Sequence, residues 1–172
     1  MTIEPVTVDL FVRSLSPAGA RGRPTGTIER LRDLVETGRI ERYSVYVTGE
    51  EVEVPSDAPA HERGEFILDR VAAFRSWAAE RGVSLDAFDR REVSTLTGER
   101  YTVLALPVMA LAESVGGDLA CVAPCSTDDG VVTVADRLES LERDDGHGPR
   151  DDRDTRSEER TGRLRGHDAV RS

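Results

Sequence analysis

Cys121 and Cys125 lie four positions apart, separated by Val-Ala-Pro, and are the residues best suited to carry chemistry. Thiolates at this spacing are able to share one metal ion, and two such thiols are also able to form a reversible redox pair. A structural zinc site needs four ligands, and the other candidates are His61, remote in sequence, and His147 and His167 near the C-terminus. We favour two small, buried thiols. A metal site or a redox sensor built on this cysteine pair is the alternative.

Arginines are concentrated in residues 21–42, which hold six Arg and four acidic residues in an otherwise acidic chain. Arg21 and Arg23 precede a predicted helix, where free backbone N–H groups also favour anions, and Arg30 and Arg32 lie within it. We take these four arginines as the candidate nucleic-acid-binding residues. The alternative is a solvated helix face on which Arg and acidic side chains pair in the ordinary way.

Catalytic arrangements of familiar type are missing from the sequence. The 33 Asp and Glu residues are too numerous for one pair to stand out, and the serines lack a G-x-S-x-G setting. The glycines at 19, 22 and 26 match neither a phosphate-binding loop nor a dinucleotide-binding fingerprint. We therefore expect a protein that is not an enzyme and that needs no cofactor.

The N-terminal elements that position these arginines follow from hydrophobic periodicity. Apolar residues alternate over 6–12, which predicts a strand with one buried face and with Phe11 on the opposite face. Thr27 is a suitable cap for a helix that ends at Gly38, and residues 40–47 predict a second strand. A strand, a helix and a strand in this order predict a β-α-β unit with parallel strands.

Residues 62–81 predict a long amphipathic helix that ends at Gly82. Its apolar stripe, spaced by three and four residues, includes Phe74 and Trp77, the only tryptophan. Arg70 interrupts the stripe, and we expect its aliphatic stem to pack there with the charge in water. We expect the strands to cover this central helix. The preceding residues 50–59 hold two prolines and several acids and predict an acidic surface loop.

The C-terminal half predicts β-hairpins with turns at 97–100, 115–118 and 127–130, followed by a short helix capped by Thr133 and Asp136. The predicted fold class is α+β. It comprises a mixed β-sheet with a β-α-β start, a long central amphipathic helix packed on the sheet, C-terminal β-hairpins and a short last helix. We expect residues 1–142 to form a single compact domain. Residues 143–172 are dense in opposite charges and nearly free of apolar side chains, which predicts a disordered tail.

The charge composition is unusual. The formal net charge is −10, carried entirely by the first 142 residues, and all 23 basic residues are Arg. High acidity without Lys is typical of halophilic proteins, although a GC-rich genome is an alternative cause. At molar salt, screening over about 3 Å weakens the usual argument that an acidic protein repels DNA. The longest apolar run, ten residues over 103–112, is too short to span a membrane, so we expect a cytoplasmic protein.

Four segments together resemble a family of small, largely uncharacterised haloarchaeal proteins labelled as helix-turn-helix (HTH) domain-containing. The segments are Val8–Leu15 (VDLFVRSL), Ile28–Leu31 (IERL), Leu106–Glu113 (LPVMALAE) and Cys121–Cys125 (CVAPC). This resemblance implies a cytoplasmic protein associated with DNA binding and transcription regulation. A protein-protein interaction or assembly module, with a protein partner or self-association and no nucleic acid, is the alternative.

Overall fold

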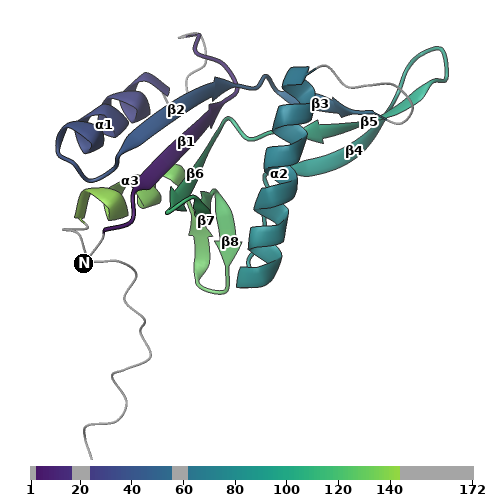
Figure 1. Cartoon of the computed structure of the whole chain (residues 1–172). Helices are drawn as coiled ribbons and strands as arrows, with labels where there is room; N and C mark the ends of the chain where they lie inside the picture. The colour runs from purple at the N-terminus through teal and green to yellow at the C-terminus, as the bar shows by residue number, and fades with distance from the viewer. Residues whose placement is uncertain (1–2, 17–23, 56–61, 144–172) are drawn as a thin grey trace, which may run out of the picture.

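The computed structural model describes residues 3–16, 24–55 and 62–143, in which helices cover both faces of a β-sheet (Figure 1). The α+β class is confirmed, with the predicted β-α-β start, C-terminal hairpins and short last helix. The helices are α1 Pro24–Glu36, α2 Glu62–Arg81 and α3 Val134–Arg143. The strands are β1 Val6–Val12, β2 Arg42–Val47, β3 Glu51–Val54, β4 Asp89–Ser94, β5 Arg100–Ala105, β6 Met109–Val115, β7 Asp118–Ala123, β8 Cys125–Thr127 and β9 Gly130–Val132.

The main sheet has the strand order β2-β1-β6-β7. β1 pairs in parallel with β2, as predicted for the β-α-β unit, and antiparallel with β6. β1 has the predicted buried face, and its other face is also covered in part, because Phe11 is 6 % exposed and packs toward α2. Val8, Leu10 and Val12 are buried on the opposite face. Both faces of the sheet are therefore covered, which alternation along a single strand does not reveal.

α2 has the predicted bounds, and its apolar stripe is buried against the sheet. The ring of Phe74 makes edge contacts with Phe11 and Phe88, and the indole N–H of Trp77 donates to the carbonyl of Ala120 at 3.2 Å. Such aromatic contacts add specific geometry to a large buried area. The charge of Arg70 does not lie in water as expected. Its guanidinium Nη2 lies 3.0 Å from Asp9 Oδ2 on β1.

α1 and α3 cover the other face of the main sheet and form a second apolar cluster to which α2 does not contribute. The expectation that one central helix organises the whole core is therefore wrong. α1 also begins earlier than predicted, at Pro24, because proline suits the first turn of a helix. Thr27 is consequently a buried residue inside the helix and not its cap. The helix ends as predicted near Gly38, which has a φ of 73°.

A second sheet of order β3-β5-β4 packs beside α2. Its strand β3 lies in the segment that we expected to be an acidic loop, so that prediction is wrong for residues 51–54. The alternating sequence Glu-Val-Glu-Val pairs with β5, and the valines pack toward the α2 cluster. Arg13, just after β1, joins the two sheets because its Nη2 donates to the carbonyl of Leu106 at 2.6 Å.

The C-terminal helix α3 has the predicted capping box. Thr133 Oγ1 accepts a hydrogen bond from the backbone N–H of Asp136, and Asp136 Oδ2 accepts from the backbone N–H of Thr133. The hydrogen bonds that Asp136 Oδ2 accepts from the backbone N–H and from the hydroxyl of Thr133 lower the pKa of Asp136. The charged tail predicted from residue 143 falls outside the described residues from position 144 onward. Among the described helices, none combines the length and the apolar character that a membrane crossing needs.

Candidate functional site

The N-terminal end of α1 differs from that of the other helices in the described part of the chain. The first turn of α1 contains no acidic residue, whereas α2 begins with Glu62 and Glu65 and α3 has Asp136. Acidic side chains in a first turn neutralise the partial positive charge of the free backbone N–H groups. Thr25 and Gly26 are exposed, and no neighbouring atom lies within 4 Å of a side-chain carbon built on Gly26. Among the described residues, nothing lies against Gly26 at this end of α1, and the end is suited to an anion.

The four arginines predicted to bind nucleic acid have different surroundings. Arg21 and Arg23 lie outside the described residues. Arg30 is turned toward α3, where its Nε lies 2.7 Å from Glu142 Oε1 and its Nη2 lies 3.0 Å from Oε2. This two-point contact raises the pKa of Arg30 and lowers that of Glu142. Arg32 is exposed and forms no ion pair with a described residue. The structure thus separates Arg30 from Arg32, although both belong to α1.

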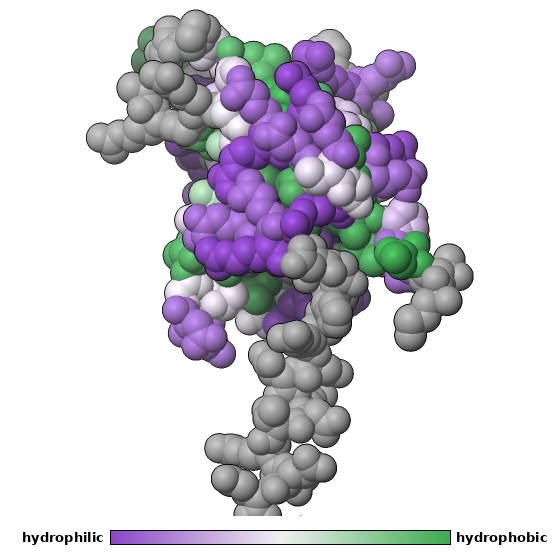
Figure 2. Space-filling view, turned by 90° about the vertical axis from the view of Figure 1, so that its left-hand side faces the viewer, coloured by the Kyte–Doolittle hydropathy of each residue, from purple (hydrophilic) through white to green (hydrophobic). Residues whose placement is uncertain are grey.

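The outward side of α1 is mixed in charge. Glu29, Asp33 and Glu36 are exposed along with Arg32, so acidic side chains outnumber basic ones beyond the first turn. Viewed from the α1 side, the molecular surface is mainly hydrophilic, with small hydrophobic areas between and beside the polar side chains (Figure 2). Any attraction for phosphate is therefore confined to the N-terminal end of α1 and does not extend along the helix.

Six other arginines in the described segments each pair with an acidic side chain. Arg70 and Arg137 pair with the half-buried Asp9 and the buried Glu113. Exposed or half-exposed pairs form between Arg13 and Glu50, Arg91 and Glu51, Arg100 and Glu92, and Arg143 and Glu139. Arg42, Arg63, Arg81 and Arg90 are exposed and form no ion pair with a described residue, but they lie on β2, at the two ends of α2 and on β4. They therefore add no second basic cluster within one element.

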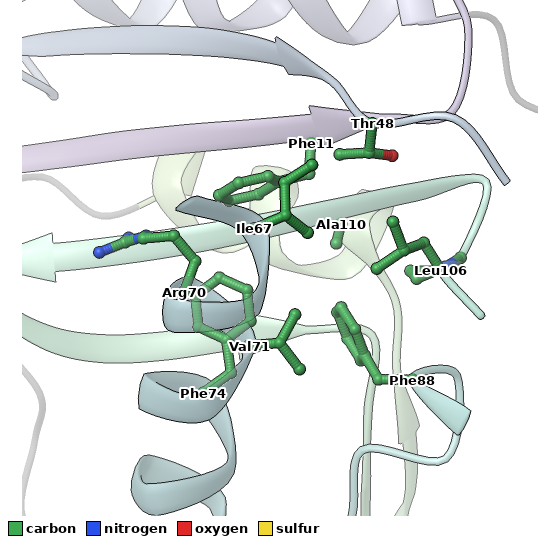
Figure 3. A pocket seen from close by; sticks show the side chains of 10 residues that line it. Phe11, Thr48, Ile67, Arg70, Val71, Phe74, Phe88, Leu106 and Ala110 are labelled. Atoms are coloured by element: carbon green, nitrogen blue, oxygen red, sulfur yellow. The ribbon is translucent and has the colours of Figure 1, made fainter. Parts of the chain in front are cut away.

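A small apolar pocket lies between β1, α2 and the segment that leads into β6 (Figure 3). Its side chains include Phe11, Ile67 and Leu106, and the guanidinium of Arg70 is directed away from them. The hydroxyl of Thr48 donates to backbone carbonyls. Burial raises the pKa of Asp9, although Arg70 and Arg42 oppose this change. Among the lining residues, no side chain is therefore arranged as a nucleophile. We interpret the pocket as a small gap in the packing of the core.

The cysteine pair lies at the end of β7 and the start of β8, and both thiols are free. Burial raises the pKa of Cys121 to about 11 and also raises that of Cys125. Metal binding and nucleophilic attack both require the thiolate, which these environments disfavour. Within the described residues, no group of three or more Cys, His, Asp or Glu side chains is placed to hold a metal ion. The surroundings of the pair favour two packed thiols over the metal or redox alternative.

Sequence reasoning did not identify the acid-free first turn of α1, because it placed the helix start at Thr27. Pro24 was the signal for the correct start, since it is favoured in the first turn. The partner of Arg30 was also missed, because Glu142 is 112 residues away in sequence.

Comparison with known proteins gives one match. A family model described as a helix-turn-helix domain matches residues 2–146, which include every described element. No curated protein and no solved structure matches the chain. In the described part of the chain, each pair of successive helices is separated by at least two strands.

Proposed function

The chain belongs to the helix-turn-helix domain family, and from this premise we propose that it is a non-enzymatic, DNA-binding protein associated with transcription regulation. The contact that we propose is with the phosphate backbone of a DNA duplex. It is made by the N-terminal end of α1, together with Arg21 and Arg23, whereas Arg32 lies further along the helix among exposed acidic side chains.

One observation supports this location above the others. α1 alone among the described helices begins without an acidic residue, and two arginines precede it in the sequence. Backbone N–H groups at a helix N-terminus bind a phosphate oxygen directly, and guanidinium groups bind phosphate by two parallel hydrogen bonds. Arg30 is left out of the proposed contact because Glu142 already occupies its guanidinium.

In this proposal, the contact positions the protein on the DNA duplex and does not recognise bases. Phosphate contacts fix a protein on the duplex but carry no sequence information directly. α1 is the first described helix and follows β1, so no described helix precedes it that would cross the DNA backbone. We therefore propose that α1 approaches the duplex with its end and not with its side, whose exposed acids would be repelled.

The test compares two double variants in a duplex-binding titration by fluorescence anisotropy, carried out in KCl from about 0.5 to 3 M. We expect Arg21→Ala/Arg23→Ala to weaken binding about tenfold at the lower salt concentration and to reduce the salt dependence, because fewer phosphates are neutralised. The control, Arg63→Ala/Arg81→Ala, removes two exposed arginines from α2 and should bind like the wild-type protein.

The proposal fails if the wild-type protein binds no duplex at micromolar concentration over this range of salt. It also fails at this location if both double variants weaken binding equally, because that result would indicate a general effect of net charge. A Glu142→Ala variant adds a further check. It frees the guanidinium of Arg30 next to the proposed contact, so we expect binding to become slightly tighter.

A further inference from the structure

Strand β2 forms an open edge of the main sheet. It pairs with β1 on one side, and no described strand pairs with its other side. Thr48, which follows β2, donates its backbone N–H to the carbonyl of Val12 on β1. Because backbone groups alternate in direction along a strand, those of Tyr43, Val45 and Val47 point away from β1. Three residues of β2 therefore present their backbone donors and acceptors outward.

Apolar side chains border this edge on both faces of the sheet. On the α1 side, Ile28 and Val35 of α1 and Tyr43 and Val45 of β2 are only partly buried, and Val47 is 39 % exposed. On the α2 side, Tyr46 stacks on Phe11 at 5.2 Å between ring centroids and also contacts Phe66, which is 38 % exposed. An unpaired backbone with apolar borders is a template for pairing with another strand.

The opposite edge of the same sheet, formed by β7, is contacted by α2. Trp77 of α2 donates its indole N–H to the carbonyl of Ala120 on β7. The β6–β7 pairing also shifts register between Glu113 and Ser114, and such irregularities limit further pairing. β2 has no proline, no lysine and no register shift against β1. Within the described segments, one edge of the sheet is thus contacted by a helix and irregular in register, whereas the β2 edge is regular and has no strand paired to it.

We propose that a second copy of this chain pairs with β2, antiparallel and across a two-fold axis at Val45. This register places Val45 opposite the partner's Val45 and Tyr43 opposite the partner's Val47, all on the α1 side of a continuous eight-stranded sheet. The outward backbone groups of Tyr43, Val45 and Val47 then pair with those of the partner. An identical strand is the natural occupant, because on the α1 side a two-fold axis matches the apolar Tyr43, Val45 and Val47 with apolar residues of the partner.

Charge also fits a second copy in this register. Arg42 is exposed at the start of β2 and Glu50 follows its end, so antiparallel pairing brings Arg42 of one copy toward the segment of the partner that carries Glu50. Glu50 is exposed and makes only a loose contact with Arg13, at 3.7 Å. The two acidic bodies, each with a formal charge of −10, repel one another at low salt. Since salt screens this repulsion, the dimer should be stronger in molar KCl.

The proposal does not rest on DNA binding, and the test uses the full chain without nucleic acid. Sedimentation equilibrium in about 3 M and about 0.3 M KCl should show a dimer whose dissociation constant is lower at high salt. Val47→Lys places a charge opposite the partner's Tyr43 and should raise the dissociation constant at least tenfold. Val45→Pro removes an outward-pointing N–H that β1 does not use, and should do the same.

The matched control is Val131→Lys, which changes another exposed strand valine, 62 % exposed, on β9. It should dimerise like the wild-type protein. Far-ultraviolet circular dichroism establishes that each variant is folded, and if Val45→Pro is not, Val47→Lys alone decides. A wild-type monomer at about 100 μM in high salt overturns the proposal. A dimer that persists in Val47→Lys, or that is weakened equally by Val131→Lys, overturns it as well.

Discussion

The two faces of the main sheet are packed by different means. On one face, the single long helix α2 brings aromatic side chains, with Phe74 at the centre of contacts to Phe11 and Phe88. On the other face, the two shorter helices α1 and α3 bring aliphatic side chains and an ion pair, in which the buried Glu113 is held by Arg137 at 2.6 Å and 3.0 Å. The α2 face is thus packed mainly by large rings, whereas the face covered by two shorter helices combines smaller apolar side chains with a buried ion pair.

This difference explains where charge is tolerated in the core. Glu113 is 4 % exposed and is the only charged residue among the buried residues of the described part. It lies on the face covered by two helices, where Arg137 of α3 reaches the sheet. On the α2 face, the corresponding pair of Asp9 and Arg70 lies near the margin, and each side chain remains 29 % exposed.

Removing the central ring tests the aromatic face and should have the largest effect. Phe74→Ala leaves a cavity under α2, and we expect a loss of about 3–5 kcal/mol in the free energy of unfolding. The control, Phe66→Ala, changes a ring on the same helix that is 38 % exposed and should cost much less. Chemical denaturation at constant salt measures both. Equal losses would show that the central ring contacts do not dominate on this face.

Removing the carboxylate of Glu113 tests the other face. Glu113→Ala leaves Arg137 without its main partner beside an apolar cluster, and we expect a loss of about 3 kcal/mol. Glu113→Gln keeps a hydrogen-bond acceptor and should be intermediate, while Glu29→Ala, at an exposed position on α1, should be nearly neutral. If Glu113→Ala is also neutral in denaturation measurements, packing alone holds this face together.

Asp9 provides a smaller, pH-dependent test of the aromatic face. Because burial raises its pKa in the folded state, the folded chain holds this proton more tightly than the unfolded chain. Its contribution to stability is therefore greatest at pH below about 4 and is lost as the pH rises through the raised value. Asp9→Asn removes this titration. Relative to the wild-type protein, the variant should gain stability from pH 4 to pH 7, measured by denaturation at fixed salt.

For Asp9, the exposed Asp33→Asn on α1 is the control. A difference between Asp9→Asn and the wild-type protein that stays constant with pH would show that burial of the Asp9 carboxyl has no net effect on its ionisation. A difference that changes in the opposite direction would show that Arg70 dominates over burial.

The smallest effect should come from the contact between α1 and α3. Arg30 and Glu142 are about one-third and two-fifths exposed, so we expect a coupling of about 0.5 kcal/mol that decreases with salt. A double-mutant cycle with Arg30→Ala and Glu142→Ala measures it. A coupling above about 2 kcal/mol would mean that this surface pair, and not the apolar cluster, holds the two helices together.

Local signals were sufficient to predict much of this fold. The apolar residues spaced by three and four, with Gly82 as the stop, gave α2 its correct bounds, and the alternation of β1 and the capping box of α3 were equally clear. Each of these features depends on residues close together in the sequence. β3 was missed because the neighbouring Pro55 and several acids resemble a loop, and only pairing with β5 makes it a strand.

The candidate site was less accessible to prediction for the same reason. A guanidinium group such as that of Arg30 binds phosphate well when it is free, but Glu142, 112 positions away in the sequence, engages it. Arg70 looked like a snorkelling side chain until β1 placed Asp9 beside it, 61 positions away. Sequence gives the charge of a side chain, whereas its availability depends on tertiary neighbours. Of the two candidate arginines that the structure describes, Arg32 is exposed, whereas Arg30 is engaged by Glu142.

The position of β1 in the sheet has a consequence for how the protein is made. β1 is complete at residue 12, but its antiparallel neighbour β6 begins at residue 109, so the middle of the sheet cannot close until most of the chain has left the ribosome. Contacts this distant in sequence slow folding. Before that point, β1, α1 and β2 can assemble as a local unit. In this unit, the edge of β1 that later pairs with β6 and the face that later packs against α2 are still uncovered.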